Sequence, residues 1–169
     1  METERLIIRE FVQGDYGALC RILCDGGVMR AAYEGAFSLE EAQNWLNRHF
    51  ARYEKLGFGL WAVVCKETGE MIGQCGLTLQ GWRDREVLEI GYLFQKAHWH
   101  KGYATEAAVA CKEYAFSVLQ AGCVYSIVRD TNTAAQGVAL RNGMQVVDRD
   151  TKSFRGVEMT FLLYSAEKE

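Results

Sequence analysis

The apolar residues of this chain change their spacing at Gly102. Before this glycine they form short β-like runs. After it they recur at helical intervals over residues 104–119, and a β-like run returns at residues 124–128. With a strand over residues 86–94, this order predicts a strand–helix–strand unit. The two strands should be parallel and joined by a right-handed crossover, with the helix on one face of the sheet.

Other predicted elements surround this unit. β-like runs occur at residues 6–11, 59–65, 71–79, 144–147 and 157–164. A short helix starts at Asp15 and is expected to end at Gly26-Gly27, a second runs from the capping-box residue Ser38 to Gly57, and a third covers residues 133–142. We therefore expect a mixed α/β fold with a central, mostly antiparallel sheet of about seven strands and helices on both faces.

Composition favours one domain over residues 1–169, because 49% of the 169 residues are hydrophobic. Formal net charge is −3 and the basic residues are scattered, which argues against a nucleic-acid partner. No apolar stretch approaches the roughly 18 residues of a membrane span, and the N-terminus has no targeting pattern. We expect a soluble cytoplasmic protein, monomeric or homodimeric, with no membrane partner.

Metal and disulfide sites are poorly supported. The six cysteines form no Cys-x-x-Cys pair, so buried free thiols are the simplest interpretation. His98 and His100 are two residues apart but have no evident third ligand, and they fit a turn with two partly exposed imidazoles. We therefore predict no metal.

The segment around Gly102 suits an anion. The first N–H groups of a helix lack partners within it and lie at the positive end of its dipole. Gly102 allows close approach, Ala104 is small and Lys101 adds positive charge. The alternative is an ordinary turn glycine beside a solvated lysine. Because nucleotide-binding glycine motifs are absent, another phosphate ligand is needed.

Three motifs, in order, resemble the GNAT superfamily of acetyl-CoA-dependent N-acetyltransferases. They are Glu89-Ile90-Gly91-Tyr92-Leu93-Phe94, Trp99-His100-Lys101-Gly102-Tyr103-Ala104-Thr105-Glu106-Ala107, and Asn132-Thr133-Ala134-Ala135-Gln136 with Val138-Ala139-Leu140-Arg141-Asn142-Gly143-Met144. The opening Thr3-Glu4-Arg5-Leu6-Ile7-Ile8-Arg9 is similar to the branch that includes the ribosomal-protein-alanine acetyltransferases.

The resemblance implies a fold of this family, acetyl-CoA as cosubstrate and an amine as acceptor. The cofactor diphosphate would rest on the backbone of a turn that includes His100, Lys101, Gly102, Tyr103, Ala104 and Thr105. Trp99 replaces the usual polar residue, so no side-chain contact is expected from it. Leu93 and Phe94 would flank the pantetheine arm, and Asn132 would hydrogen-bond it. The alternative role for Asn132 is that of a helix N-cap without a ligand.

Glu89 is the candidate general base for the attacking amine. Strand alternation puts it on one face with Val87, Gly91 and Leu93, among apolar neighbours that should raise its pKa. The alternative is a carboxylate paired with an arginine or exposed at a sheet edge. The general acid is left open, because Ala139 and Ala135 replace the tyrosine and serine common in the family. Tyr164, Tyr103 or a water could substitute.

We expect the acceptor amine to be a peptide or protein N-terminus, an amino acid or another small amine, and to attack directly in a ternary complex. By family analogy, the two N-terminal helices supply the acceptor wall, with Tyr33 and Glu34 as candidates suited to a cationic amine. Trp82, in a polar loop, is a possible substrate wall, whereas the other aromatics fit the core. One alternative function is a non-catalytic acyl-CoA sensor that has lost the proton-transfer groups, and Ala135 and Ala139 keep this alternative open. Another is a redox or metal protein, which the cysteine spacing disfavours.

Overall fold

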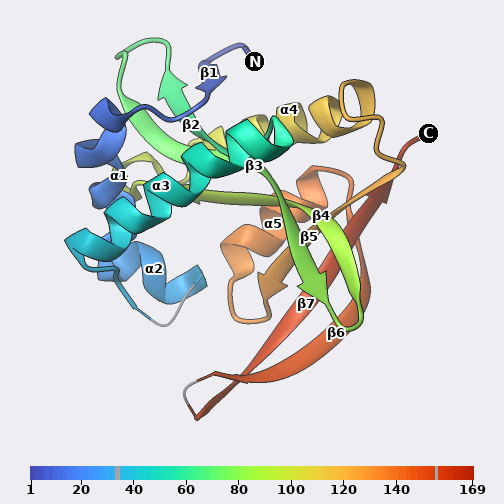
Figure 1. The fold of residues 1–169 in the computed structure, drawn as a ribbon. Coiled ribbons are helices and arrows are strands. Elements are labelled where there is room, and N and C mark those ends of the chain that lie inside the picture. The colour runs from blue at the N-terminus through green and yellow to red at the C-terminus, as the bar shows by residue number, and fades with distance from the viewer. Residues whose placement is uncertain (33–34, 155) are drawn as a thin grey trace.

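Seven strands form one sheet in the part of the chain that the computed structural model describes, residues 1–32, 35–154 and 156–169 (Figure 1). In spatial order they are β1 (Leu6–Arg9), β2 (Leu60–Cys65), β3 (Met71–Trp82), β4 (Arg85–Phe94), β5 (Cys123–Arg129), β7 (Val157–Glu167) and β6 (Gln145–Phe154). Neighbours are antiparallel except β4 and β5, which are parallel. The predicted mostly antiparallel sheet with one parallel unit is confirmed.

Helices cover both faces of the sheet. They are α1 (Tyr16–Leu23), α2 (Gly26–Ala32), α3 (Leu39–Leu56), α4 (Tyr103–Ser117) and α5 (Thr133–Arg141). Figure 1 shows α3 crossing in front of the sheet and α4 behind it. Alternation along β3 explains this, since the Cys75 Sγ lies 3.5 Å from the Sγ of Cys111 in α4. The preceding residue, Gln74, instead lines a cavity with residues of α3.

The long helix α3 begins and ends where its sequence predicts. The Ser38 hydroxyl accepts a hydrogen bond from the backbone N–H of Glu41, and the Glu41 carboxylate accepts one from the backbone N–H of Ser38. Gly57 closes the helix with φ of 78°, in the left-handed region that glycine adopts without strain. Both ends are therefore fixed by local chemistry.

The prediction for Gly26-Gly27 was wrong. These glycines begin α2 rather than ending α1, which stops at Leu23. The Asp25 carboxylate accepts hydrogen bonds from the backbone N–H groups of Gly27 and Val28, at 2.8 and 3.2 Å, so it caps the new helix. Val28 and Met29 are buried, and this packing offsets the low helix propensity of the glycines.

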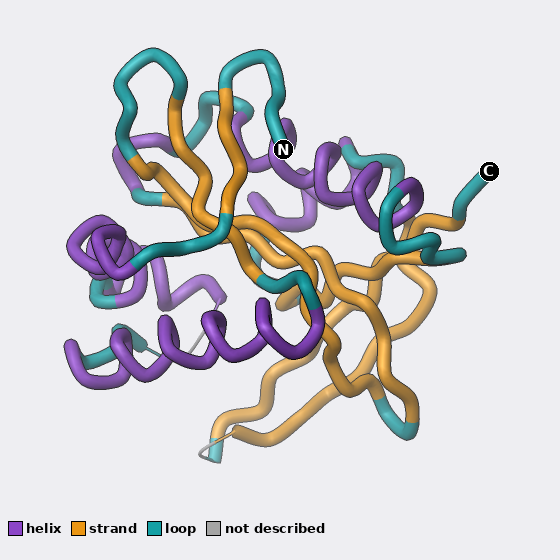
Figure 2. The backbone as a smooth tube through the Cα atoms, turned by 45° about the horizontal axis from the view of Figure 1, so that its top comes forward, coloured by secondary structure: helices purple, strands orange, loops and turns teal. Residues whose placement is uncertain are grey.

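Strand β6 is longer than predicted, running to Phe154 instead of Val147. Its additional residues are polar up to Ser153, and they are held by backbone pairing with β7 rather than by an apolar pattern. Figure 2 shows β6 and β7 as a hairpin that projects from the rest of the sheet. The first strand, in contrast, ends at Arg9, two residues earlier than expected.

The parallel strands β4 and β5 are paired through a single residue pair, Glu89 with Tyr125. Side chains satisfy the backbone groups just beyond it. The Ser126 hydroxyl donates to the carbonyl oxygen of Ile90 at 3.0 Å, and the backbone N–H of Ile127 donates to Oε2 of Glu89 at 3.0 Å. The sheet therefore opens at Glu89, and both cavities described below are lined by residues that follow this point in β4.

Candidate active site

A cavity of about 480 Å³ lies against the start of α4. Of the nine residues predicted to bind the cofactor, eight line it: Leu93, Phe94, His100, Gly102, Tyr103, Ala104, Thr105 and Asn132. They come from the end of β4, the turn and the start of α5. The fold thus brings together three segments that the sequence separates by up to about forty residues, and their contacts with a cofactor remain a prediction.

The turn at Gly102 has the geometry of an anion site. Gly102 is the N-cap of α4 with φ of 79°, and His100 also has a positive φ, of 61°. The backbone N–H groups of Tyr103, Ala104 and Thr105 belong to the first turn, where a helix offers them no internal acceptor. A Cβ on Gly102 would lie 3.3 Å from Nη2 of Arg5, so a side chain here would be both strained and crowded.

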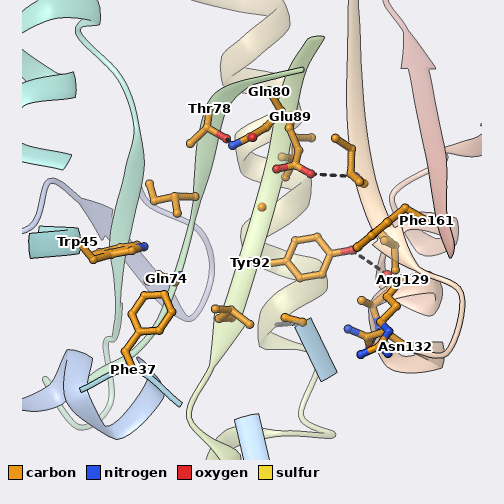
Figure 3. Close-up of a pocket in the computed structure, with 18 of the residues that line it drawn as sticks. Phe37, Trp45, Gln74, Thr78, Gln80, Glu89, Tyr92, Arg129, Asn132 and Phe161 are labelled. Carbon is orange, nitrogen blue, oxygen red and sulfur yellow. Dashed lines mark hydrogen bonds between the residues drawn. The ribbon is translucent and has the colours of Figure 1, made fainter. Parts of the chain in front are cut away.

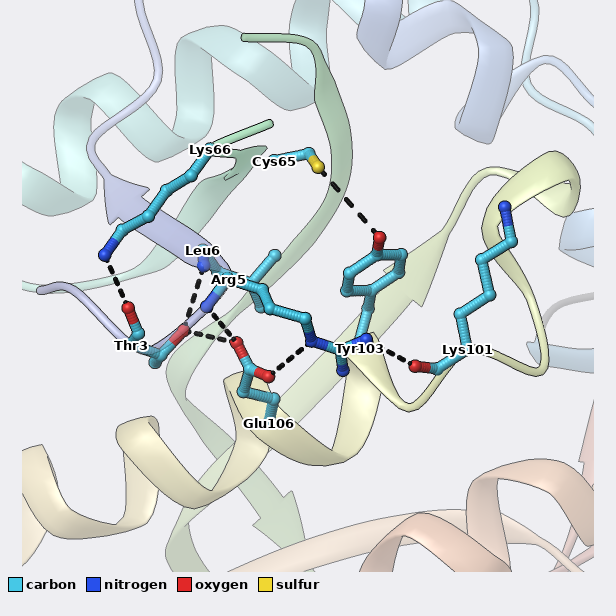
Figure 4. Close-up of polar contacts among 8 residues, drawn as sticks. All are labelled: Thr3, Arg5, Leu6, Cys65, Lys66, Lys101, Tyr103 and Glu106. Atoms are coloured by element: carbon cyan, nitrogen blue, oxygen red, sulfur yellow. Dashed lines mark hydrogen bonds and ion pairs between the residues drawn. The ribbon is translucent and has the colours of Figure 1, made fainter. Parts of the chain in front are cut away.

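The side chain of Arg5, which precedes β1, binds the turn at Gly102 (Figure 4). Its Nη1 donates to the carbonyl oxygen of Lys101 at 2.8 Å, and its Nε donates to Glu106 at 2.9 Å. The guanidinium carbon also lies 4.4 Å from the ring centroid of Tyr103. One side chain therefore contacts the turn and the first turn of the helix that follows it.

One predicted cofactor residue, Lys101, is not among the described residues that line this cavity. Its carbonyl is bound by Arg5, while its side chain is exposed and points away from Arg5 (Figure 4). Trp99 does line the cavity, and its indole N–H donates to the carbonyl oxygen of Phe94 at 2.9 Å. This bond ties the loop back to the end of β4.

Asn132 is the N-cap of α5, as the alternative interpretation held. Its Oδ1 accepts from the backbone N–H of Ala135 at 3.1 Å. The same residue also lines the cavity, so capping and ligand binding are compatible at this position.

A second cavity, of about 740 Å³, lies between α3, the strands β3 and β4, and the β6–β7 hairpin. In Figure 3, Phe37 and Trp45 lie on one side, Arg129, Asn132 and Phe161 on the other, and Glu89 and Tyr92 between them. The residues that line both cavities are Ala32, Tyr92, Leu93, Asn132 and Ala135. The two cavities therefore meet at the point where β4 and β5 separate.

Glu89 lines the larger cavity. Its Oε2 is held by the N–H of Ile127, and its Oε1 lies 3.8 Å from where a Cβ on Gly91 would be. Burial raises the pKa of Glu89 to about 7, against the opposing effect of the Ile127 hydrogen bond. The predicted direction of the shift is confirmed. Strand β4 is the fourth of seven, so Glu89 is not at a sheet edge, and the ion pairs of the described residues do not include it.

Tyr92 is the residue that sequence reasoning missed. It stands where the cavities meet, and its hydroxyl donates to the carbonyl oxygen of Ala135 at 2.7 Å. Burial raises its pKa well above the usual tyrosine range, so the hydroxyl stays protonated. Of the tyrosines considered earlier, Tyr164 is buried in the core, and Tyr103 points its hydroxyl toward the Cys65 sulfur, 4.0 Å away. Only the position of Tyr92 in the folded sheet shows its relevance.

Two tryptophans, Trp82 and Trp45, show how the aromatic residues are divided between core and site. Trp82 is fully buried at the end of β3, and its indole N–H donates to Asp148 at 2.8 Å, so the suggestion that it forms a substrate wall was wrong. Trp45 is buried in the core, as expected, and it also lines the larger cavity from α3. Tyr33 and Glu34 lie outside the described residues. Within the described ranges, no group of three or more His, Cys, Asp or Glu residues is arranged to hold a metal ion.

Comparison with known proteins defines the family. Residues 5–145 match the family model described as an acetyltransferase (GNAT) domain. The chain is 34% identical over 142 residues to the uncharacterized protein YkkB of Bacillus subtilis (strain 168), covering 84% of this chain and 83% of that protein. It is 29% identical over 146 residues to the uncharacterized N-acetyltransferase YoaA of the same strain, covering 86% and 82%. A crystal structure of an acetyltransferase from Agrobacterium tumefaciens str. C58 superposes with a TM-score of 0.83 and 27% identity, covering 99% of this chain and 94% of that one.

The chain therefore belongs to the GNAT acetyltransferase family. It is an acetyl-CoA-dependent acyltransferase, and the fold agrees with that of the family. No helix among the described residues is long and apolar enough to span a membrane.

Proposed function

We propose that this protein transfers the acetyl group of acetyl-CoA to a primary amine, with Glu89 as general base. The observation that carries the proposal is the position of Glu89, whose carboxylate faces a cavity that joins the one at the start of α4. An acyl donor in the smaller cavity and an amine in the larger one would meet beside Tyr92 and Leu93. Holding two reactants in adjoining cavities supplies much of the rate in such transfers.

The residues around the smaller cavity fit acetyl-CoA. Backbone N–H groups of Tyr103, Ala104 and Thr105 would hold the diphosphate at the helix N-terminus, with Lys101 adding positive charge nearby. Leu93, Phe94 and Asn132 would line the pantetheine arm, as the family resemblance implies. When bound, acetyl-CoA supplies the activated acetyl thioester, and every proton is moved by the protein or by water.

Glu89 would take a proton from the attacking amine, directly or through a water. The Ile127 hydrogen bond fixes Oε2, which leaves Oε1 toward the cavity above Gly91. A pKa of about 7 suits a base that must be ionised near neutrality and must also accept a proton from the amine nitrogen, which becomes positively charged as it attacks. As the new N–C bond forms and the C–S bond breaks, this proton leaves the nitrogen.

Tyr92 is the candidate acid for the departing sulfur. Its raised pKa keeps the hydroxyl protonated, and it lies at the junction of the cavities, where the thioester would be. Ala139, which stands where many relatives carry a tyrosine, is buried and has no proton to give. The proton of Tyr92 would go to the departing thiolate, so that free CoA thiol is released, and the tyrosine would regain a proton from water or from the protonated Glu89.

The opening strand supports a finer placement in the branch that includes the ribosomal-protein-alanine acetyltransferases, through the resemblance of residues 3–9. An acceptor in that branch would present a peptide or protein N-terminus. An amino acid or another small amine has the same reacting nitrogen, and the size of the cavity, about 740 Å³, suits a ligand of that kind.

The test is release of CoA thiol from acetyl-CoA with a panel of primary amines, measured from pH 5.5 to 9. Replacing Glu89 by glutamine should lower kcat/KM by roughly a hundredfold, the usual size of a general-base contribution. Ionisation of the amine affects wild type and variant equally, so it cancels in the ratio of their rates. This ratio should rise with pH as Glu89 ionises and level off above about pH 7. Glu86→Gln is the matched control, because Glu86 is exposed on the same strand. Equal rates for Glu89→Gln and wild type across this range would refute the assignment.

A further inference from the structure

Basic side chains outnumber acidic ones around the larger cavity. Four basic side chains and two acidic ones line it among the described residues: Arg48, Arg52, Arg129 and Lys152, against Glu41 and Glu89. The whole chain, in contrast, has a formal net charge of −3. The positive excess is therefore local to this cavity.

Some arginines of the described residues are paired with carboxylates, whereas the four basic groups of the cavity are not. Arg5, Arg9, Arg83 and Arg149 each form an ion pair with a carboxylate. The ion pairs of the described residues include none of the four cavity groups. Arg48 and Arg52 are one helical turn apart on α3, so both side chains lie on the same face as Trp45. Unpaired guanidinium groups at this spacing suit a carboxylate or phosphate.

Two buried polar atoms in the same lining lack a partner. They are Nδ1 of His49 and Oε1 of Gln74, in side chains only 1% and 2% exposed. Nη1 of Arg52 lies 3.1 Å from Nε2 of His49, and because an arginine can only donate, Nε2 accepts and Nδ1 carries the ring proton. The cavity thus has a buried donor on one wall and a buried acceptor on the strand wall. A buried polar atom without a partner costs free energy, so a ligand whose polar groups reach these two side chains would be favoured.

The remaining surface of the cavity is apolar and aromatic. Trp45 and Phe161 lie on opposite sides of it (Figure 3), and Leu60 and Met159 also line it. A ligand would therefore need an apolar body between its polar ends.

We infer that the acceptor is a small amine that also carries an anionic group, a carboxylate or a phosphate, held by Arg48 and Arg52 while its amine faces Glu89. Arg129, beside Asn132 on the opposite wall (Figure 3), adds to the positive field. This inference rests on the proposed acetyl transfer, and it excludes a polyamine as the preferred acceptor, because a second ammonium group would face unpaired guanidinium groups.

The experiment compares matched acceptors by release of CoA thiol from acetyl-CoA. Phenylalanine is paired with phenylalaninamide, which lacks only the negative charge, and 2-aminoethyl phosphate is paired with ethanolamine, so that carboxylate and phosphate are tested separately. Spermidine serves as the cationic acceptor. We expect kcat/KM to be at least about tenfold higher for an anionic acceptor than for its neutral partner. The amine of phenylalaninamide is less basic than that of phenylalanine, so a larger fraction of it is unprotonated and able to attack. This difference favours the neutral acceptor, so a preference for phenylalanine would have to overcome it.

Variants connect the preference to the residues. Arg48→Gln and Arg52→Gln, which each remove one of the two guanidinium groups assigned to the anion, should each raise KM for the anionic acceptor about tenfold and change kcat/KM for the neutral one less than twofold. Arg48 is exposed, so its replacement should leave folding intact. Arg21→Gln, which removes an exposed arginine of α1 outside both cavities, is the matched control.

Three results would overturn the inference in different ways. Equal or better use of phenylalaninamide, ethanolamine or spermidine would reject an anionic acceptor and leave acetyl transfer standing. An anionic preference that survives both variants would reject the assigned arginines. No CoA release with any amine would reject the proposed function itself, and the inference with it.

Discussion

In the proposed mechanism, the carboxylate of Glu89 has two tasks, one structural and one chemical. Its Oε2 satisfies the backbone N–H of Ile127 where β4 and β5 separate, and its raised pKa suits proton transfer. The hydrogen bond favours the ionised form, but desolvation is the larger effect. An uncharged side chain at this position would avoid the desolvation of a carboxylate. The loss of stability that this desolvation causes therefore indicates that Glu89 has a functional role.

This cost predicts a pH-dependent effect of Glu89→Gln on stability. An unfolded glutamate loses its proton near pH 4.5, whereas the folded one keeps it to about pH 7. Stability from this group is therefore full below about pH 4.5 and is lost as pH rises through 7. Glutamine does not titrate, so the melting temperature of the variant minus that of wild type should increase between pH 5 and pH 8. Thermal unfolding at both values measures it, with Glu86→Gln as control, and a difference that is the same at both would contradict the raised pKa.

Elements with local determinants could be predicted from the sequence, and those fixed by distant contacts could not. The capping box at Ser38 and the left-handed Gly57 set α3, and both are visible in the sequence. Helix α2 could not be found in the same way, because burial of Val28 and Met29 decides against the glycine pair. The candidate site follows the same division. Eight of the nine proposed cofactor residues share one cavity, but the roles of Tyr92 and Trp45 depend on how separate elements pack.

The start of α4 depends on an element almost a hundred residues earlier in the chain. Glu106 lies in the first turn, where its negative charge would oppose a bound diphosphate. Arg5 offsets that charge at 2.9 Å and binds the Lys101 carbonyl, as Figure 4 shows. The segment before β1 is therefore part of the proposed cofactor site, although it does not line the cavity.

Arg5→Gln should consequently weaken acetyl-CoA binding more than it slows the reaction. We expect KM for acetyl-CoA to rise about tenfold, as for loss of a charge-assisted contact, and kcat to change less than twofold. Steady-state kinetics with acetyl-CoA varied at a fixed, saturating amine would measure both. Arg21→Gln controls for loss of positive charge elsewhere. A fall in kcat with KM unchanged would show that Arg5 acts on the chemistry instead of the turn.

At the scale of the whole molecule, the sheet is divided by the single pair between Glu89 and Tyr125. On one side of it β1 to β4 form one antiparallel layer, and on the other β5, β7 and β6 form a second. A ligand that spans the opening, from the turn at Gly102 to Tyr92, would contact both parts. Binding should therefore stabilise the molecule against global unfolding, and the size of the effect should depend on how much of the opening the ligand spans.

This dependence can be measured with two acyl donors. At a hundred times its Kd, acetyl-CoA should stabilise the folded state by about 2.7 kcal/mol. For a chain of this size that corresponds to a rise in Tm of about 5–10 °C. Acetyl-pantetheine carries the same thioester without the diphosphate, so at equal concentration it should raise Tm far less if the α4 N-terminus holds the phosphates. Equal shifts for the two donors would mean that the turn at Gly102 contributes no phosphate binding, whereas a large shift with acetyl-CoA that Arg5→Gln reduces would connect the anion site to the helix and to the residue that positions it.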